Sequence, residues 1–225
     1  MKCIFKRVPI MALFLMLSGT LAAEDFSFVN GATPLAKGRK AFSFDLGVEY
    51  PEPILYGIRF DYGFVKNYQV GASAFYYPKS FYSIGMNNAI ALIESGSHHF
   101  GFIFSPSYVV DLNSKTILLS PVLVYEHRIG NKQRTGLFLK GGTAHARVSR
   151  DIFASSYGLY FKRVSPDEDF WENSFIFKAG IQHQVGKKLA ITFEVGTVTK
   201  MDFSDVLSDA FFSDPIGKIA LTWGF

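Results

Sequence analysis

Cysteine is almost missing from this chain. Its 225 residues include a single cysteine, Cys3, which lies within the first 23 residues. Those residues are expected to be removed on export, so the mature chain would contain no cysteine. This excludes disulfide bonds, thiolate catalysis and cysteine-ligated metal sites. An exported chain of this kind must be held together by its backbone hydrogen bonds and its packing.

Long apolar runs are scarce as well. The longest run covers 8–17; it follows three basic residues and leads into mostly small residues that end at Ala23. This order is typical of a secretory signal peptide cleaved after Ala22 or Ala23. A membrane-spanning helix is the alternative, but the run is shorter than the roughly 20 residues that such a helix needs. No later stretch approaches that length.

An excess of one charge is also nearly absent once the leader is set aside. The full chain carries a net charge of +4, and Lys2, Lys6 and Arg7 of the leader account for three of those charges. A mature chain near neutrality gives no reason to expect a nucleic-acid partner. Glycine-rich phosphate loops and metal-ligand spacings are missing too. We therefore expect no cofactor, no metal and no nucleic acid.

The mature chain is rich in apolar residues that alternate with polar ones. Between Tyr56 and Phe64 every second residue is apolar, and glycines and charged residues lie between them. Such alternation places the two sets on opposite faces of a β-strand. Ten segments show this pattern, at 40–50, 54–64, 68–77, 82–93, 98–110, 116–127, 135–147, 173–185, 189–199 and 215–225.

The composition of the two faces favours a barrel over a secreted β-sandwich, which is the alternative. A sandwich usually presents many lysines and glutamates to water, whereas here the polar face is rich in glycine, serine and isolated charges of both signs. The apolar face is rich in aromatic residues, and the chain holds 24 Phe and 11 Tyr. Aromatic residues suit a lipid-facing surface, and glycine allows a crowded inner wall to close. The sequence predicts an all-β fold, a transmembrane antiparallel up-and-down β-barrel.

The number of strands depends on 82–93, where Asn87 and Asn88 interrupt the alternation. With this segment the barrel has ten strands; the alternative is eight, because bacterial barrels normally have an even number. The short turns near 65–67, 94–97, 129–134 and 186–188 would then face the periplasm. The expected organisation is a signal peptide at 1–23, an N-terminal periplasmic segment at 24–39 and a barrel at 40–225.

The last strand carries a recognisable pattern. Its apolar positions share one face and end in an aromatic residue; they are Ile219, Leu221, Trp223 and Phe225. This pattern resembles the C-terminal signature of bacterial outer-membrane β-barrel proteins. The resemblance implies an integral outer-membrane location, contact with outer-membrane lipid and recognition by the barrel-assembly machinery. It extends over the mature chain as architecture and indicates no subfamily.

Eight charged residues are expected on the inward face, four acidic and four basic. Because a buried ion loses its hydration, these side chains should pair with one another. Their network would fill a lumen this narrow, and a polar path for small solutes is the alternative. The residues are Asp45, Glu49, Arg59, Asp61, Lys140, Lys178, Glu194 and Lys218.

Catalytic candidates are weak, and we assign no catalytic residue. Ser97 and His99 lie beside Glu94, a combination that could hydrolyse an acyl bond. They fall at a periplasmic turn, however, and do not resemble the His-x-Ser pattern of lipid A deacylase barrels. His145, near the external rim, has no acidic partner in a recognisable protease motif.

The preferred functional hypothesis is a non-enzymatic barrel with a structural or surface-interaction role. Its external contacts would be made through the outer loops 148–172 and 200–214, which are rich in acidic residues but lack the spacing of a calcium loop. A narrow channel for small solutes or ions is the alternative. A lipid-modifying outer-membrane enzyme is the second alternative.

The barrel fold itself can be tested on a gel. A closed ladder of backbone hydrogen bonds resists detergent until it is heated, so the mature chain should migrate differently before and after boiling. Identical migration of heated and unheated samples would contradict the barrel.

Overall fold

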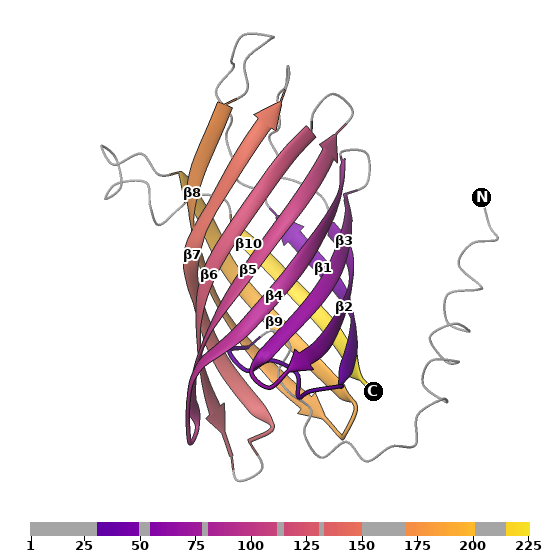
Figure 1. The fold of residues 1–225 in the computed structure, drawn as a ribbon, viewed down its shortest axis with the longest axis vertical. Helices are drawn as coiled ribbons and strands as arrows, with labels where there is room; N and C mark the ends of the chain where they lie inside the picture. The colour runs from indigo at the N-terminus through magenta and orange to yellow at the C-terminus, as the bar shows by residue number, and fades with distance from the viewer. Residues whose placement is uncertain are drawn as a thin grey trace, which may run out of the picture.

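The computed structural model describes residues 31–49, 55–77, 81–111, 115–130, 133–149, 170–200 and 215–225. Ten antiparallel strands close into one barrel, in which β1 pairs with β2 on one side and with β10 on the other (Figure 1). No helix in the described ranges is long and apolar enough to cross a membrane. The strands are β1 (Lys40–Glu49), β2 (Leu55–Val65), β3 (Tyr68–Tyr77), β4 (Phe81–Ser95), β5 (His98–Asp111), β6 (Lys115–Ile129), β7 (Thr135–Ser149), β8 (Phe170–Val185), β9 (Leu189–Lys200) and β10 (Pro215–Gly224).

The predicted up-and-down barrel is confirmed, and so is the uncertain strand at 82–93, which is β4. The two asparagines that interrupt its alternation are accommodated by neighbouring strands. Ser105 of β5 donates a hydrogen bond to Asn87 Oδ1 at 3.1 Å, and the Tyr68 hydroxyl of β3 donates to Asn88 Oδ1 at 3.0 Å. An amide can therefore occupy either face of this strand, and the eight-stranded alternative is wrong.

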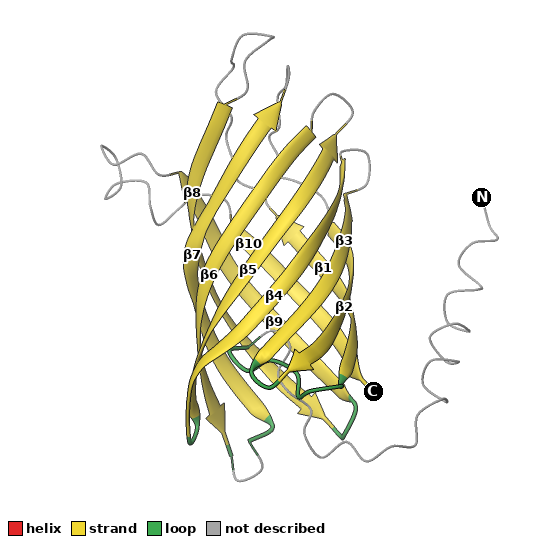
Figure 2. Cartoon of the chain, viewed as in Figure 1, coloured by secondary structure: helices red, strands yellow, loops and turns green. Residues whose placement is uncertain are grey.

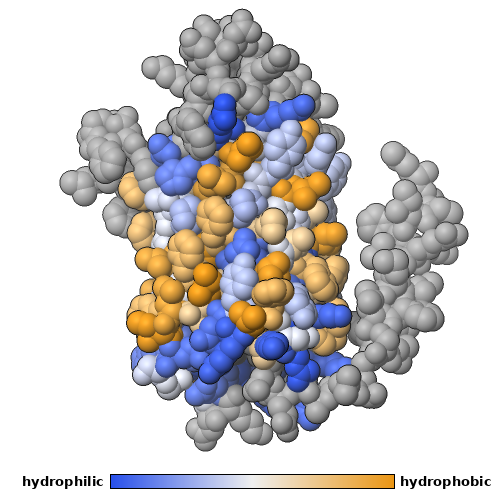
Figure 3. Space-filling view, in the orientation of Figure 1, coloured by the Kyte–Doolittle hydropathy of each residue, from blue (hydrophilic) through white to orange (hydrophobic). Residues whose placement is uncertain are grey.

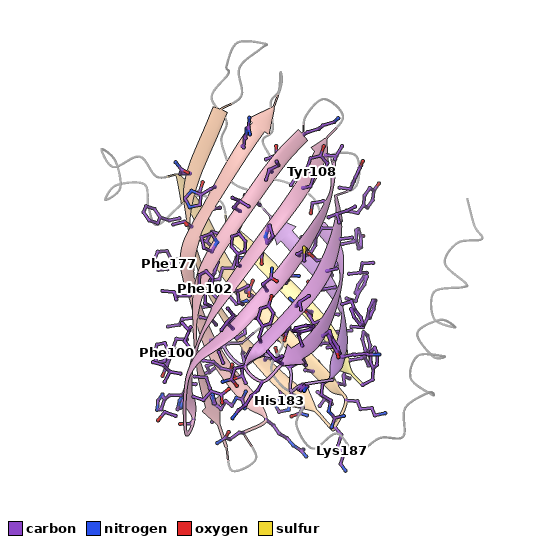
Figure 4. The ribbon with its side chains drawn as sticks, viewed as in Figure 1. Phe100, Phe102, Tyr108, Phe177, His183 and Lys187 are labelled. Atoms are coloured by element: carbon purple, nitrogen blue, oxygen red, sulfur yellow. The ribbon has the colours of Figure 1, made fainter. Side chains whose placement is uncertain are left out.

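The outer face of the barrel is apolar. Large hydrophobic side chains on it are 38–65% exposed. Together they form a larger continuous apolar surface than a water-soluble protein of this size normally exposes. Figure 3 shows hydrophobic residues spread over the visible wall among more polar ones, and Figure 4 labels three of the exposed ones, Phe100, Tyr108 and Phe177, together with the half-buried Phe102. Closure leaves no unpaired strand edge, which is the condition for placing a sheet in lipid.

Four short turns gather at one end of the barrel, which we call the turn end (Figure 2). The turns contain Asn67, Gly96, Gly130 and Gly186, all with positive φ between 58° and 87°. They coincide with the four turns that the sequence predicts at the periplasmic side. The connections at the opposite end, at 50–54, 78–80, 112–114, 150–169 and 201–214, lie outside the described residues.

Glycines on the inner wall make room for large inward side chains on the neighbouring strand. Gly180 of β8 lies opposite Phe138 of β7, and Gly57 of β2 lies opposite Phe75 of β3. A Cβ atom at either glycine would overlap the facing phenyl ring. These pairs explain why the inward register is so rich in glycine.

Adding one carbon at Gly180 should therefore destabilise the barrel. We expect Gly180→Ala to lower the free energy of unfolding by about 1–3 kcal/mol, because Phe138 is buried and cannot move aside. Denaturant-induced unfolding in detergent micelles measures the change.

Gly141→Ala is the matched control, since the nearest atom to its added Cβ would lie 3.8 Å away. Equal stability of the two variants would contradict this account of the inner wall.

Candidate functional site

The lumen contains a group of three charged side chains on β7, β8 and β9. Lys140 and Lys178 lie directly opposite each other, and Glu194 accepts hydrogen bonds from both amines. The Lys178 Nζ lies 3.3 Å from Glu194 Oε1, and Lys140 pairs with the other carboxylate oxygen. Only 3% of the Glu194 side chain is exposed. One buried carboxylate thus offsets the repulsion between two facing lysines.

A second group of charges lies across β1, β2 and β10. Arg59 Nε lies 2.8 Å from Asp61 Oδ2, and Lys218 Nζ lies 3.8 Å from Asp45 Oδ2. Arg59 also donates a long hydrogen bond of 3.4 Å to Ser43. We call the two groups together the charge belt: Asp45, Arg59, Asp61, Lys140, Lys178, Glu194 and Lys218.

The charge belt contains seven of the eight residues that the sequence places on the inward face. The side chain of the eighth, Glu49, lies outside the described residues. A further pair, which the eight predicted residues do not include, lies on β6, where Arg128 Nε donates to Glu126 Oε1 at 2.9 Å. Alternation along β6 places both residues inward, so the signal was present in the register of that strand.

The chain segment before β1 lies inside the barrel. Residues 31–39, part of the segment expected in the periplasm at 24–39, occupy the turn end of the lumen (Figure 2). The backbone N–H of Ala32 donates to Glu126 Oε2 at 2.7 Å, and that of Leu35 donates to Gln69 Oε1 at 2.9 Å. Ala32 and Leu35 are 3% and 1% exposed. We call residues 31–39 the inner segment.

Two glycines of the wall allow the inner segment to approach closely. A Cβ atom at Gly63 would overlap the backbone of Leu35 and Ala36, and one at Gly101 would overlap that of Ala32. Two backbone hydrogen bonds also join the segment to Gly63. The N–H of Gly38 donates to the Gly63 carbonyl at 2.8 Å, and the N–H of Gly63 donates to the Arg39 carbonyl at 2.9 Å. Apolar packing completes the contact, because Ala32 clusters with Val124 and Phe138.

A chain of polar contacts connects the inner segment with the charge belt. Gln69 accepts the N–H of Leu35 and donates through Nε2 to Asp61 Oδ1 at 3.0 Å. Asp61 is the partner of Arg59, so the seat of the segment and the belt share side chains. Displacing the segment would leave the buried Gln69 oxygen without this donor.

Of the residues considered for catalysis, His99 of β5 lies directly opposite Glu94 of β4 in the strand register, and Ser97 lies in the turn between these strands. His99 faces the lumen, is buried and lies opposite Glu126 in the strand register. His98 faces outward, with Nδ1 2.8 Å from the Tyr125 hydroxyl. His145 is also on the outer face, where it contacts Asn173 and Thr143. Within the described ranges no group of three metal-ligating side chains is found.

The four residues of the C-terminal pattern lie on the outer face of β10. Ile219 and Phe225 are 44% and 51% exposed, and the Phe225 ring lies 6.5 Å from that of Phe60 on β2. Trp223 pairs with Phe42 across the closing ladder, and Leu221 pairs with Phe44. Recognition of this pattern by the assembly machinery stays a prediction.

The apolar outer face, the charged lumen and the closed ladder decide the class of protein. The chain is an integral outer-membrane β-barrel. Its turn end therefore faces the periplasm, because periplasmic connections are the short ones in such barrels. No protein-family model matches the barrel, and no curated protein is similar to it in sequence.

Several solved barrels are partly similar to this one. The N-terminal β-barrel domain of Pseudomonas aeruginosa OprF is 10% identical over 85% of this chain and 100% of its own, with a TM-score of 0.40. The KdgM porin is 8% identical over 82% of this chain and 99% of its own, with a TM-score of 0.43. The outer membrane enzyme PagL is 12% identical over 82% of this chain and 98% of its own, with a TM-score of 0.37. These low values provide no basis for assigning an activity.

The central role of Glu194 in the belt can be tested by its removal. Glu194→Ala leaves Lys140 and Lys178 facing each other without a counter-ion, and breaking a buried pair in this way costs about 3–5 kcal/mol. We expect a loss of that size in denaturant-induced unfolding.

Lys178→Ala is the comparison, since it leaves the Lys140–Glu194 pair intact and should cost less. A smaller loss for Glu194→Ala than for Lys178→Ala would contradict the arrangement.

Proposed function

We propose that this protein is a closed, non-enzymatic barrel with a structural or surface-interaction role at its external end. The observation that carries the proposal is the inner segment in the periplasmic mouth. Transport through the resting barrel would have to pass this segment, whose contacting residues are buried. Leu35, Gln69 and Glu126 are 1%, 2% and 0% exposed there.

The lengths of the strands support an external role. Strands β4 to β8 have 14–16 residues, whereas β1, β3 and β10 have 10. At about 3.3 Å per residue, four to six extra residues lengthen a strand by roughly 13–20 Å. Figure 1 shows β5 to β8 rising above β1 and β3 at the end opposite the turns. The barrel would thus present a raised wall on one side to the outside.

The outer loops 148–172 and 200–214 would make the external contacts in this proposal. Most of each loop lies outside the described residues, but the strands that lead into the first one are paired nearly to their ends. Val148 of β7 lies opposite Phe170 of β8 in the ladder. A loop whose two ends are joined to paired strands is suited to recognition, because loops positioned by a rigid scaffold carry much of the binding function of proteins.

A narrow channel is the second candidate, favoured by the exposure of two lysines. The side chains of Lys178 and Lys218 are 27% and 17% exposed although both face the lumen, so space remains beside the charge belt. In this candidate the inner segment is the part that closes the path, and its release would open it.

Conductance in planar bilayers tests both candidates. The closed barrel predicts silence from the mature wild-type protein, and a steady open current would contradict it. Glu126→Ala removes the acceptor of the Ala32 N–H and should loosen the inner segment.

Current from Glu126→Ala, with silence from the wild type, would support a channel closed by the segment. Glu94→Ala is the matched control, because Glu94 is an exposed acidic residue at the same end. Silence from a folded Glu126→Ala variant, and from one lacking 31–37, would contradict the channel.

A further inference from the structure

Five basic side chains form a contiguous group around part of the periplasmic rim. Going around the barrel, they lie at the start of β7, in the β8–β9 turn, at the start of β1 and in the β2–β3 turn. Within that run, β10 is the strand that contributes no basic side chain at this end. Four are exposed and one is half-buried. We call them the basic arc: Arg134, Lys187, Lys188, Lys40 and Lys66.

Backbone hydrogen bonds bring the members of the basic arc together. The N–H of Gly224 donates to the carbonyl of Lys188 at 2.8 Å, which joins the β8–β9 turn to the end of β10. Phe225 and Lys40 exchange two such bonds, of 2.8 and 2.9 Å. On the other side, Arg134 accepts the N–H of Gln184 at 2.8 Å. The backbone positions that carry these side chains are therefore joined to one another along the rim.

An exposed apolar side chain accompanies the basic arc at each of its sites. The apolar partners are Leu137 for Arg134, Val185 for the β8–β9 turn, Phe225 for Lys40 and Phe64 for Lys66, with exposures of 43%, 45%, 51% and 57%. All four lie on the lipid-facing surface, one to three residues or one backbone pair away from the charge. Figure 4 shows Lys187 and His183 at this lower margin of the outer face.

The rest of the rim differs from the basic arc. The β4–β5 turn carries the acidic Glu94, followed by Ser95, Gly96 and Ser97. The adjoining outer surface carries aromatic rings, with those of His98 and His127 tilted by 34° and their centroids 4.7 Å apart. Among the described residues of this rim, exposed positive charge is therefore concentrated on one side of the barrel.

We propose that the basic arc binds the headgroups of anionic phospholipids in the periplasmic leaflet. The apolar partners place acyl chains against the barrel, and the amines beside them lie where the phosphates of those same lipids would be. Lysine and arginine stems pack along apolar surface while their charged ends reach the interface. A soluble anion would use the charges but gain nothing from the four apolar neighbours, which is why a lipid fits better.

Native mass spectrometry of the mature protein in detergent tests the proposal. Phosphatidylglycerol should be retained about tenfold or more in preference to phosphatidylcholine with the same acyl chains. Each basic residue near an anionic lipid surface contributes about fivefold to binding. The triple variant Lys66→Gln, Lys187→Gln, Lys188→Gln should therefore lose the preference.

Lys37→Gln is the control for a single charge, to be compared with Lys187→Gln. Lys37 is exposed on the inner segment and has no lipid-facing apolar neighbour, so this variant should keep the preference. Folding of each variant is checked by heat-modifiable migration, and a triple variant that fails to fold is replaced by Lys187→Gln alone.

Three results would overturn the proposal: no preference in the wild type, a preference that survives the triple variant, or an equal loss in Lys37→Gln. Glycerol phosphate, which has the headgroup charge but no acyl chains, distinguishes lipid from free phosphate. Binding of glycerol phosphate as tight as that of phosphatidylglycerol would also overturn it.

Discussion

The pairing of β1 with β10 is the interaction on which the rest of this molecule depends. In lipid no water can satisfy a free strand edge, so a sheet is admissible there only when its first and last strands meet. Nine residue pairs join these two strands, from Ala41 opposite Gly224 to Glu49 opposite Ile216. Every outward residue can then be apolar, because no backbone group needs a polar neighbour.

Closure also dictates the chemistry of the interior. Side chains that point inward from ten strands must share a narrow space with one another. The barrel meets this demand in two ways: glycine opposite a large residue, as at Gly180 and Phe138, and charges that neutralise each other, as around Glu194. Neither arrangement forms a hydrophobic core. The buried residues of this barrel therefore include many polar side chains.

The fold could be predicted from the sequence because successive side chains of a strand point to opposite faces. In a membrane barrel the residues that face lipid are apolar, so every second residue is apolar. The segment at 82–93 shows how this works when the pattern weakens, since Ser105 and Tyr68 on the two neighbouring strands donate hydrogen bonds to the amide oxygens of its asparagines. The pairing of charges within the lumen could not be predicted in the same way. Lys140 lies opposite Lys178 in the ladder, yet both pair with Glu194 from the next strand, and this depends on the stagger of the strands.

The inner segment was beyond sequence reasoning for a different reason. Residues 31–39 show no alternation, and their partners Gln69 and Glu126 are 34 and 94 positions further along the chain. A carboxylate on β6 that satisfies a backbone N–H near the start of the chain is a tertiary contact with no local signal. The identity of a residue such as Gly101 becomes understandable only when its neighbour in the lumen is known.

The seat of the inner segment has a consequence for the order in which the molecule is put together. Its contacts come from β2, β3, β5, β6 and β7, whereas the ladder is completed by β10, the last strand of the chain. Residues 31–39 can therefore complete their contacts only when strands as late as β7 are in place. Residues 31–39 thus join strands that are not neighbours in the sheet, such as β2 and β6, at the turn end of the barrel.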